Sequence, residues 1–156
     1  MSIAIRLLRK LASLRRAEGG NAGIEFSIAA PVLVAMLVPI TDLGMGIYQQ
    51  MQVRDAAQAG AQYAMAHGWD SAAIQAAVTS ATTLSGLAAS PAPTRSCGCP
   101  GQNGIDSAAC GATCQNGKAA GVYVTVNAQA TYTPLVPYPT LGSSLALTAQ
   151  TTARIQ

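Results

Sequence analysis

The side chains best suited to chemistry in this 156-residue chain are four cysteines that form two close pairs. Cys97 and Cys99 are separated by one residue, and Cys110 and Cys114 by three, with a Gly/Asn/Asp-rich loop between the pairs. Zinc ribbons favour C-x₂-C, and thioredoxin-like redox sites use C-x-x-C, so neither spacing matches. Two disulfides between the pairs are therefore expected, either 97–114 with 99–110 or 97–110 with 99–114. A membrane-anchored metal-binding or redox module is the alternative.

General acid–base chemistry has few candidates. The chain has one histidine, His67, and six scattered acids, with no nucleophile beside a base. His67 precedes Gly68 and is interpreted as a cation at the end of a helix. The sequence therefore predicts neither an enzyme nor a bound cofactor or metal.

The net charge of +3 belongs to the N-terminal end of the chain. Five of the nine basic residues precede Gly20, and the remaining four are scattered: Arg54, Arg95, Lys118 and Arg154. Nucleic-acid binding needs basic residues clustered on one face, so no nucleic-acid partner is expected. Residues 1–16 alternate basic and apolar side chains, which is typical of a helix on an anionic membrane surface or of a cleavable leader.

A long apolar stretch must position these features. No charged residue occurs between Glu25 and Asp42, and residues 24–48 predict a membrane span with the basic end in the cytoplasm. A secretory signal peptide is the rival, but its apolar region is shorter. Glu25 is either a carboxylate at a helix N-terminus or a charge kept to pair with a cation. Asp42 is either solvated at the outer boundary or in polar contact with a partner helix.

Small residues continue the helical pattern beyond the predicted span. Ala56, Gly60 and Ala64 follow one another at intervals of four, which puts them in one row where helices can approach closely. The predicted helix runs over residues 22–66, and Gly68 supplies its C-terminal cap.

The remaining sequence predicts a small α+β domain over residues 68–156. Asp70 caps a helix predicted over residues 71–84, and residues 84–95 form a linker with at most a weak edge strand because of Pro91 and Pro93. Residues 121–132 alternate cleanly and predict a half-buried strand, and residues 145–155 predict its return strand. The inner faces are expected to hold Val122, Val124, Val126, Ala128 and Ala130 of the first strand and Leu145, Leu147, Ala149, Thr151, Ala153 and Ile155 of the second. A proline-rich turn is expected over 134–139, with Leu135, Val136 and Tyr138 either exposed at its tip or packed beneath it. A three-stranded antiparallel sheet is expected to pack on the outer part of the long helix.

Several motifs in the long helix resemble known pilin sequences. The segment Gly20-Asn21-Ala22-Gly23-Ile24-Glu25-Phe26 resembles the processing site of type IV prepilins. In order and spacing, four motifs resemble the TadE-like pseudopilins of tight-adherence (Tad, or Flp) pili: Gly23-Ile24-Glu25-Phe26-Ser27, Pro31-Val32-Leu33, Asp42-Leu43-Gly44 and the alanine row from Ala56 to Ala64.

The resemblance implies that the chain is processed by proteolysis. A prepilin peptidase would cut after Gly20, residues 1–20 would be the leader, and Asn21 would become the N-terminus of a long helix over 21–67. Glu25 would then meet an N-terminal amine, its own or a neighbour's. Two departures stand out: Asn21 replaces the usual first residue, and Gly19 offers a second cut.

The implied function is structural. The family suggests a minor pilin of type IV pilin-like fold, anchored once in the bacterial inner membrane, with a disulfide-stapled periplasmic domain, and acting in pilus assembly and adherence. Its implied partners are the membrane, the prepilin peptidase, other pilin or pseudopilin subunits and the Tad assembly platform. A bitopic accessory protein that keeps its leader is a third hypothesis.

Overall fold

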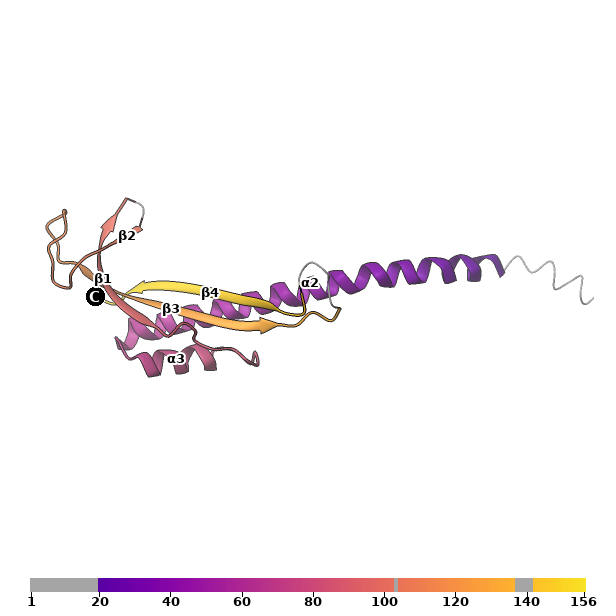
Figure 1. Ribbon diagram of the computed structural model, residues 1–156, viewed down its shortest axis with the longest axis horizontal. Helices are drawn as coiled ribbons and strands as arrows, with labels where there is room; N and C mark the ends of the chain where they lie inside the picture. Colours follow the sequence, from indigo (N-terminus) through magenta and orange to yellow (C-terminus); the bar gives the residue numbers. More distant parts are fainter. Residues whose placement is uncertain (1–19, 103, 137–141) are drawn as a thin grey trace, which may run out of the picture. The chain divides into compact units, whose positions relative to one another are not determined.

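The computed structural model describes residues 20–102, 104–136 and 142–156, and these residues form an α+β protein (Figure 1). In chain order the elements are α2 (Gly20–His67), α3 (Ser71–Ser80), β1 (Thr94–Gly101), β2 (Gly104–Ser107), β3 (Gly121–Tyr132) and β4 (Leu145–Arg154). The predicted leader lies outside the described residues except for Gly20, and so does Tyr138 of the predicted turn. The chain divides into two compact units, one ending at Thr41 and the other beginning at Asp42.

The first unit contains the N-terminal part of α2, whose apolar side chains are exposed. Phe26 and Ile28 are 69% and 70% exposed, and Val32, Leu33, Leu37 and Ile40 are similarly open. Within the described residues, α2 is the one helix long and apolar enough to cross a membrane, with a window of mean hydropathy 2.0 that is 0% buried. Its hydroxyl groups are satisfied internally, since Ser27 donates to the Gly23 carbonyl and Thr41 to the Leu37 carbonyl. Such a surface is suited to an apolar environment.

The second unit begins with the C-terminal part of α2, which ends where the sequence predicts. The backbone N–H of Gly68 donates to the Ala64 carbonyl at 2.9 Å, and Gly68 has φ +83°, a left-handed conformation that favours glycine. Asp70 then caps α3 through Oδ1, which accepts hydrogen bonds from the N–H groups of Ala72 and Ala73. Helix α3 ends at Ser80, before the predicted residue 84, and the Thr82 hydroxyl accepts from the Leu84 N–H instead.

The sheet has four antiparallel strands in the order β2-β1-β3-β4, so the prediction of three strands is wrong. Strand β1, which contains the C-x-C pair, lies between β2 and β3 and is not an edge strand. Residues 84–93 contribute only an isolated bridge between Ala88 and Gln129. The prediction failed because Gly98 and Pro100 interrupt any apolar alternation in β1, and its position depends on pairing with β3.

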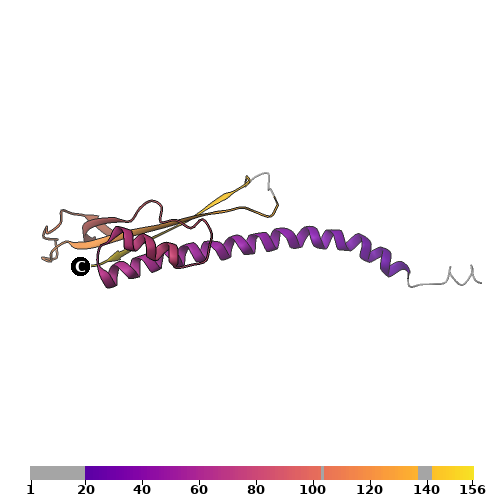
Figure 2. The same cartoon turned by 90° about the horizontal axis from the view of Figure 1, so that it is seen from below.

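The core lies between one face of this sheet and the two helices (Figure 2). Four predicted inner residues of β3 are buried (Val124, Val126, Ala128 and Ala130), Val122 is only half-buried, and Tyr132 extends that face. The largest fully buried side chains are Val53 of α2, Ile74 and Val78 of α3, and Val124 and Val126 of β3. One predicted inner residue of β4 is exposed, since Leu145 is 44% exposed at the start of the strand. On the opposite face of β3, Tyr123 is 8% exposed, and Gly121 leaves room for its ring.

Candidate functional site

The first candidate site is the beginning of α2. Gly20 is the first described residue of α2, so the predicted processing bond between Gly20 and Asn21 lies at the beginning of the described helix. Glu25 is exposed and shares a shallow groove with Ile28, Ala29, Val32 and Leu33. These positions recur at helical spacing and form one side of the helix, so the carboxylate lies next to an apolar stripe. That arrangement suits contact with another apolar helix that brings a cation to Glu25.

The second candidate site surrounds Asp42, which is only 2% exposed. The Tyr132 hydroxyl donates to the Asp42 carboxylate and lies 2.8 Å from the Asp42 backbone carbonyl oxygen. The backbone N–H of Leu135 donates to Oδ1 of Asp42 at 3.0 Å. The Tyr132 ring also lies over Gly46, where an added Cβ would be 3.4 Å from the ring. These contacts tie the end of β3 and the residues that follow it to α2.

The sequence-based interpretation of Asp42 as a simply solvated carboxylate is therefore wrong. Its hydrogen-bond donors come from its own chain, from residues that are about 90 positions away in the sequence. The sequence placed Tyr132 at the end of a strand but provided no partner for it. The one signal available was that Tyr132 continues the buried alternation of β3. A role of Asp42 in assembly between subunits stays a prediction.

The row of small residues is the third feature. Ala56 and Ala64 are fully buried, and Gly60 lies against α3 and β3 of the same chain. A Cβ placed on Gly60 would lie 2.6 Å from Cγ2 of Val78 and 2.9 Å from Cγ1 of Val126. The row thus seats α2 on its own domain. The opposite face of the helix exposes polar side chains, among them Arg54, Asp55, Gln58 and Gln62.

The cysteines form two disulfides, Cys97–Cys110 and Cys99–Cys114, so the second of the two predicted pairings is confirmed. No cysteine is free. Among the described residues, no group of three or more His, Cys, Asp or Glu side chains could hold a metal ion. The bridges fasten the loop before β3 to β1, and they do not favour a metal-binding or redox module.

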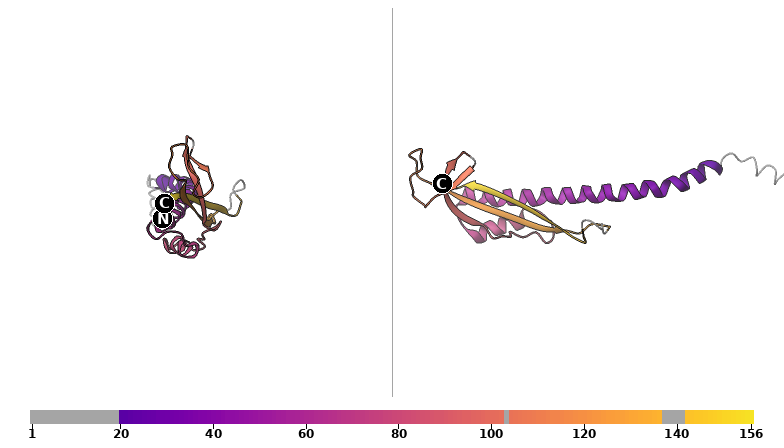
Figure 3. Two further views of the ribbon diagram at one scale, coloured as in Figure 1. Left: turned by 90° about the vertical axis from the view of Figure 1, so that its left-hand side faces the viewer. Right: turned by 45° about the horizontal axis from the view of Figure 1, so that its top comes forward.

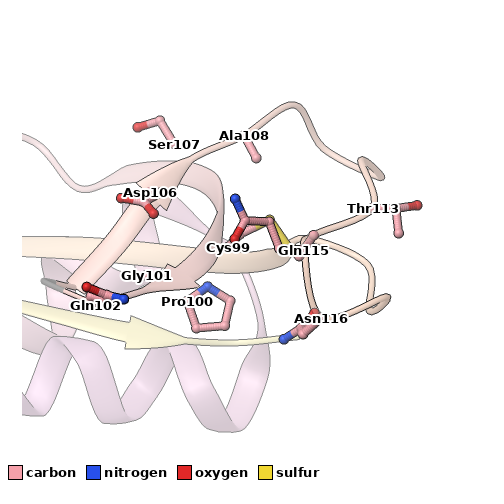
Figure 4. Close-up of a pocket in the computed structure, with 11 residues that line it drawn as sticks. Cys99, Pro100, Gly101, Gln102, Asp106, Ser107, Ala108, Thr113, Gln115 and Asn116 are labelled. Atoms are coloured by element: carbon pink, nitrogen blue, oxygen red, sulfur yellow. A yellow bond between two sulfur atoms is a disulfide. The ribbon is translucent and has the colours of Figure 1, made fainter.

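An open pocket of about 840 Å³ lies beside the Cys99–Cys114 bridge (Figure 4). Its described lining consists mainly of uncharged polar groups and backbone, including Gln102, Ser107, Thr113, Gln115 and Asn116. Asp106 is the one ionisable side chain in that lining. A single carboxylate without a partner base or acid gives no basis for assigning catalysis to this pocket.

Comparison with known proteins supports the resemblance predicted from the motifs. Residues 20–62 match the family model of TadE-like proteins. The match covers most of α2, including Glu25, Asp42 and Gly60, and none of the sheet. No curated protein and no solved structure matches the chain.

Proposed function

We propose that this TadE-like protein of the Tad pilus system is a minor pilin or pseudopilin that a prepilin peptidase processes between Gly20 and Asn21. In this proposal the mature chain begins at Asn21 and enters pilus assembly through its long helix. The work of the protein is packing between subunits and not catalysis, in keeping with a structural family.

The observation that carries the proposal is the difference in side-chain exposure between the two parts of α2. Its N-terminal part, up to Thr41, exposes its large apolar side chains, whereas one face of its C-terminal part is buried against a small folded domain. A soluble helix would not expose so many large apolar side chains, because each would remain in contact with water. A helix that first crosses a membrane and then packs against other helices uses the same surface twice.

The proposed topology follows from charge. Positive residues near a membrane segment are retained in the cytoplasm, and here they precede Gly20. The domain that begins beyond the span would then lie in the periplasm, on the single-pass anchor in the inner membrane. Two disulfides in that domain support an oxidising compartment. After assembly the domain would be presented on or at the base of the pilus, where it would contribute to adherence.

Glu25 has a specific part in this proposal. Cleavage after Gly20 makes Glu25 the fifth residue of the mature chain and creates an ammonium group on Asn21. A carboxylate among apolar side chains is costly unless a cation pairs with it. The amine of the same or a neighbouring subunit supplies that cation, so a subunit enters the assembly only in a register that joins the two charges.

The test is intact mass and N-terminal sequencing of membrane-purified protein, co-expressed with an active or an inactive prepilin peptidase. The expected mature N-terminus is Asn21 with the active enzyme and Met1 with the inactive one. Gly20→Val should block cleavage, because the bulkier residue occupies the position before the cut. Gly44→Ala is the matched control, since it lies outside the processing segment, a Cβ there meets no atom within 4 Å, and cleavage should continue.

Two results would count against parts of the proposal. Mature protein that begins at Gly20 would move the cut to the bond after Gly19. Met1 as the sole N-terminus in the presence of active peptidase would refute processing and favour an accessory protein that keeps its leader.

A further inference from the structure

We infer that the β3–β4 end of the domain is a second membrane contact, which inserts into the outer headgroup region of the bilayer that α2 crosses. The contact surface is named the apolar tip here and consists of Leu135, Val136 and Leu145. The inference rests on the proposed membrane-spanning role of α2 and adds a lipid surface as a partner of the folded domain.

Contacts with Asp42 and Gly46 of α2 hold the apolar tip beside this part of the helix. The Leu135 N–H donates to the Asp42 carboxylate, and the Tyr132 hydroxyl donates to the same group. The Tyr132 ring packs over Gly46, one helical turn further on. These three contacts, made by Tyr132 at the end of β3 and by Leu135 after it, fix the end of β3 beside residues 42–46 of the helix.

That point on α2 coincides with the outer end of the hydrocarbon core. A bilayer core is about 30 Å thick and takes about 20 helical residues. Counted from Glu25 at the cytoplasmic edge, about 20 residues end near Gly44, between Asp42 and Gly46. Tyr48, which is 58% exposed, then falls in the headgroup layer, where aromatic side chains are enriched.

The side chains of the apolar tip are open to their surroundings. Leu135 is 71% exposed, Leu145 is 44% exposed and Val136 is 41% exposed. On the helix at the same level, Leu43 and Met45 are also exposed. Exposed apolar side chains therefore occur on the tip and also on this level of α2, and lipid is the partner inferred for them.

Charge is distributed along the sheet in the manner that such a contact requires. No charged residue occurs between Lys118 and Arg154, a stretch that includes all of β3 and nearly all of β4. Figure 3 shows the ribbons of β3 and β4 side by side along their length. At the end of β3 opposite to the apolar tip, Arg95 pairs in register with Val124 and Arg154 with Tyr123. Charged groups at the apolar tip would resist entry into the interface, and the strands hold none there.

The hydrogen bonds of Asp42 have a purpose in this arrangement. A carboxylate near the edge of the hydrocarbon core is costly when water is excluded from it. The donors Tyr132 and Leu135 replace water at Oδ1 of that group and bring the apolar tip with them. The same interaction thus shields the acid and sets the depth of the domain.

The experiment places single tryptophans in the full chain and measures their contact with lipid. In a Trp69→Phe background, three variants are reconstituted into phosphatidylcholine–phosphatidylglycerol vesicles: Leu33→Trp in the span, Leu135→Trp in the apolar tip and Ile105→Trp on β2. Ile105 is 45% exposed and serves as the matched control at the far end of the sheet. Fluorescence is recorded with lipids brominated either near the headgroup or deep in the acyl chain, and with aqueous acrylamide. Thiol titration checks that each variant keeps its disulfides.

The expected result is an ordered set of losses in emission. Leu33→Trp loses most emission with deep bromines. Leu135→Trp shifts to shorter wavelength and loses most with shallow bromines, and Ile105→Trp loses emission only to acrylamide. If Leu33→Trp is quenched but Leu135→Trp behaves like Ile105→Trp, the apolar tip is in water and the inference is overturned while the anchor stands. A blue-shifted Leu135→Trp without quenching by bromine would mean that a protein surface covers the tip, which also overturns it. Failure of bromines to quench Leu33→Trp would refute the membrane anchor itself, and the inference with it.

Discussion

Replacing Gly60 with alanine tests the packing of α2 on its own domain. The added Cβ would lie 2.6 Å from the Val78 Cγ2 atom and 2.9 Å from the Val126 Cγ1 atom. Both valines are 0% exposed, and β-branched side chains have little freedom about χ1. Val126 pairs with Thr151 of β4, and the preceding residue Thr125 is paired with both β1 and β4, so the strand cannot yield easily. The methyl group therefore forces α2 and the sheet apart.

The magnitude follows from two opposing terms. Overpacking a close-packed core costs about 1–3 kcal/mol, and two contacts below 3 Å place this site at about 3 kcal/mol. Alanine is favoured over glycine inside a helix by about 1 kcal/mol. The net expectation is a loss of about 2 kcal/mol in the free energy of unfolding. For a domain of about 100 residues, that loss lowers the unfolding midpoint by roughly 8 °C.

The assay is urea and thermal unfolding of the full chain in mild detergent, followed by Trp69 fluorescence with the disulfides intact. Gly44→Ala is the matched control, since it adds the same methyl group to the same helix with no atom within 4 Å. It should leave stability unchanged or raise it slightly. Val78→Ala removes one of the two clashing methyl groups, so the double variant Gly60→Ala/Val78→Ala should be more stable than the sum of the single losses indicates.

The reasoning would be refuted if Gly60→Ala were as stable as Gly44→Ala. Strict additivity of Gly60→Ala with Val78→Ala would show that α3 is not the neighbour that resists the added methyl group. The first result would mean that the small-residue row faces another partner, and the second that β3 alone opposes the added methyl group.

Three further predictions concern the hydrogen bonds and disulfides that stabilise the domain. Tyr132→Phe should lower the free energy of unfolding by about 2 kcal/mol, because it removes a hydroxyl that donates to the buried Asp42 carboxylate. The same unfolding assay measures this loss. A loss no larger than that of the exposed control Thr131→Ala would contradict the prediction. Thiol titration of the denatured protein should find no free thiol before reduction and four after it, and two thiols before reduction would show that one bridge is missing. Removing the Cys97–Cys110 bridge as a double alanine variant should cost about 3 kcal/mol, since each bridge closes a loop of about 15 residues.

Much of the fold could be predicted because its signals are local. Apolar side chains at helical spacing predicted the long helix, and Gly68 predicted its end, since a left-handed cap needs only one glycine at one place. Clean alternation predicted β3 and β4, because residues two apart share a face of any strand. The motifs at Gly20 and Glu25 pointed to the family for the same reason, as they depend on spacing along the chain.

What only the tertiary structure decided involves partners that are distant in sequence. The spacing of Ala56, Gly60 and Ala64 predicted a packing row, but that row fits a neighbouring helix or a sheet equally well, and only the fold placed α3 and β3 against it. The cysteine spacing allowed two pairings. The structure has Cys97–Cys110 and Cys99–Cys114, in a fold where β1 is paired with β2 on one side and β3 on the other. Asp42 could be recognised as an unusual acid, whereas its burial required Tyr132 and Leu135 to be brought to it. Contacts of that kind leave no periodic trace in the sequence, because they join two points of the chain and not a repeating pattern.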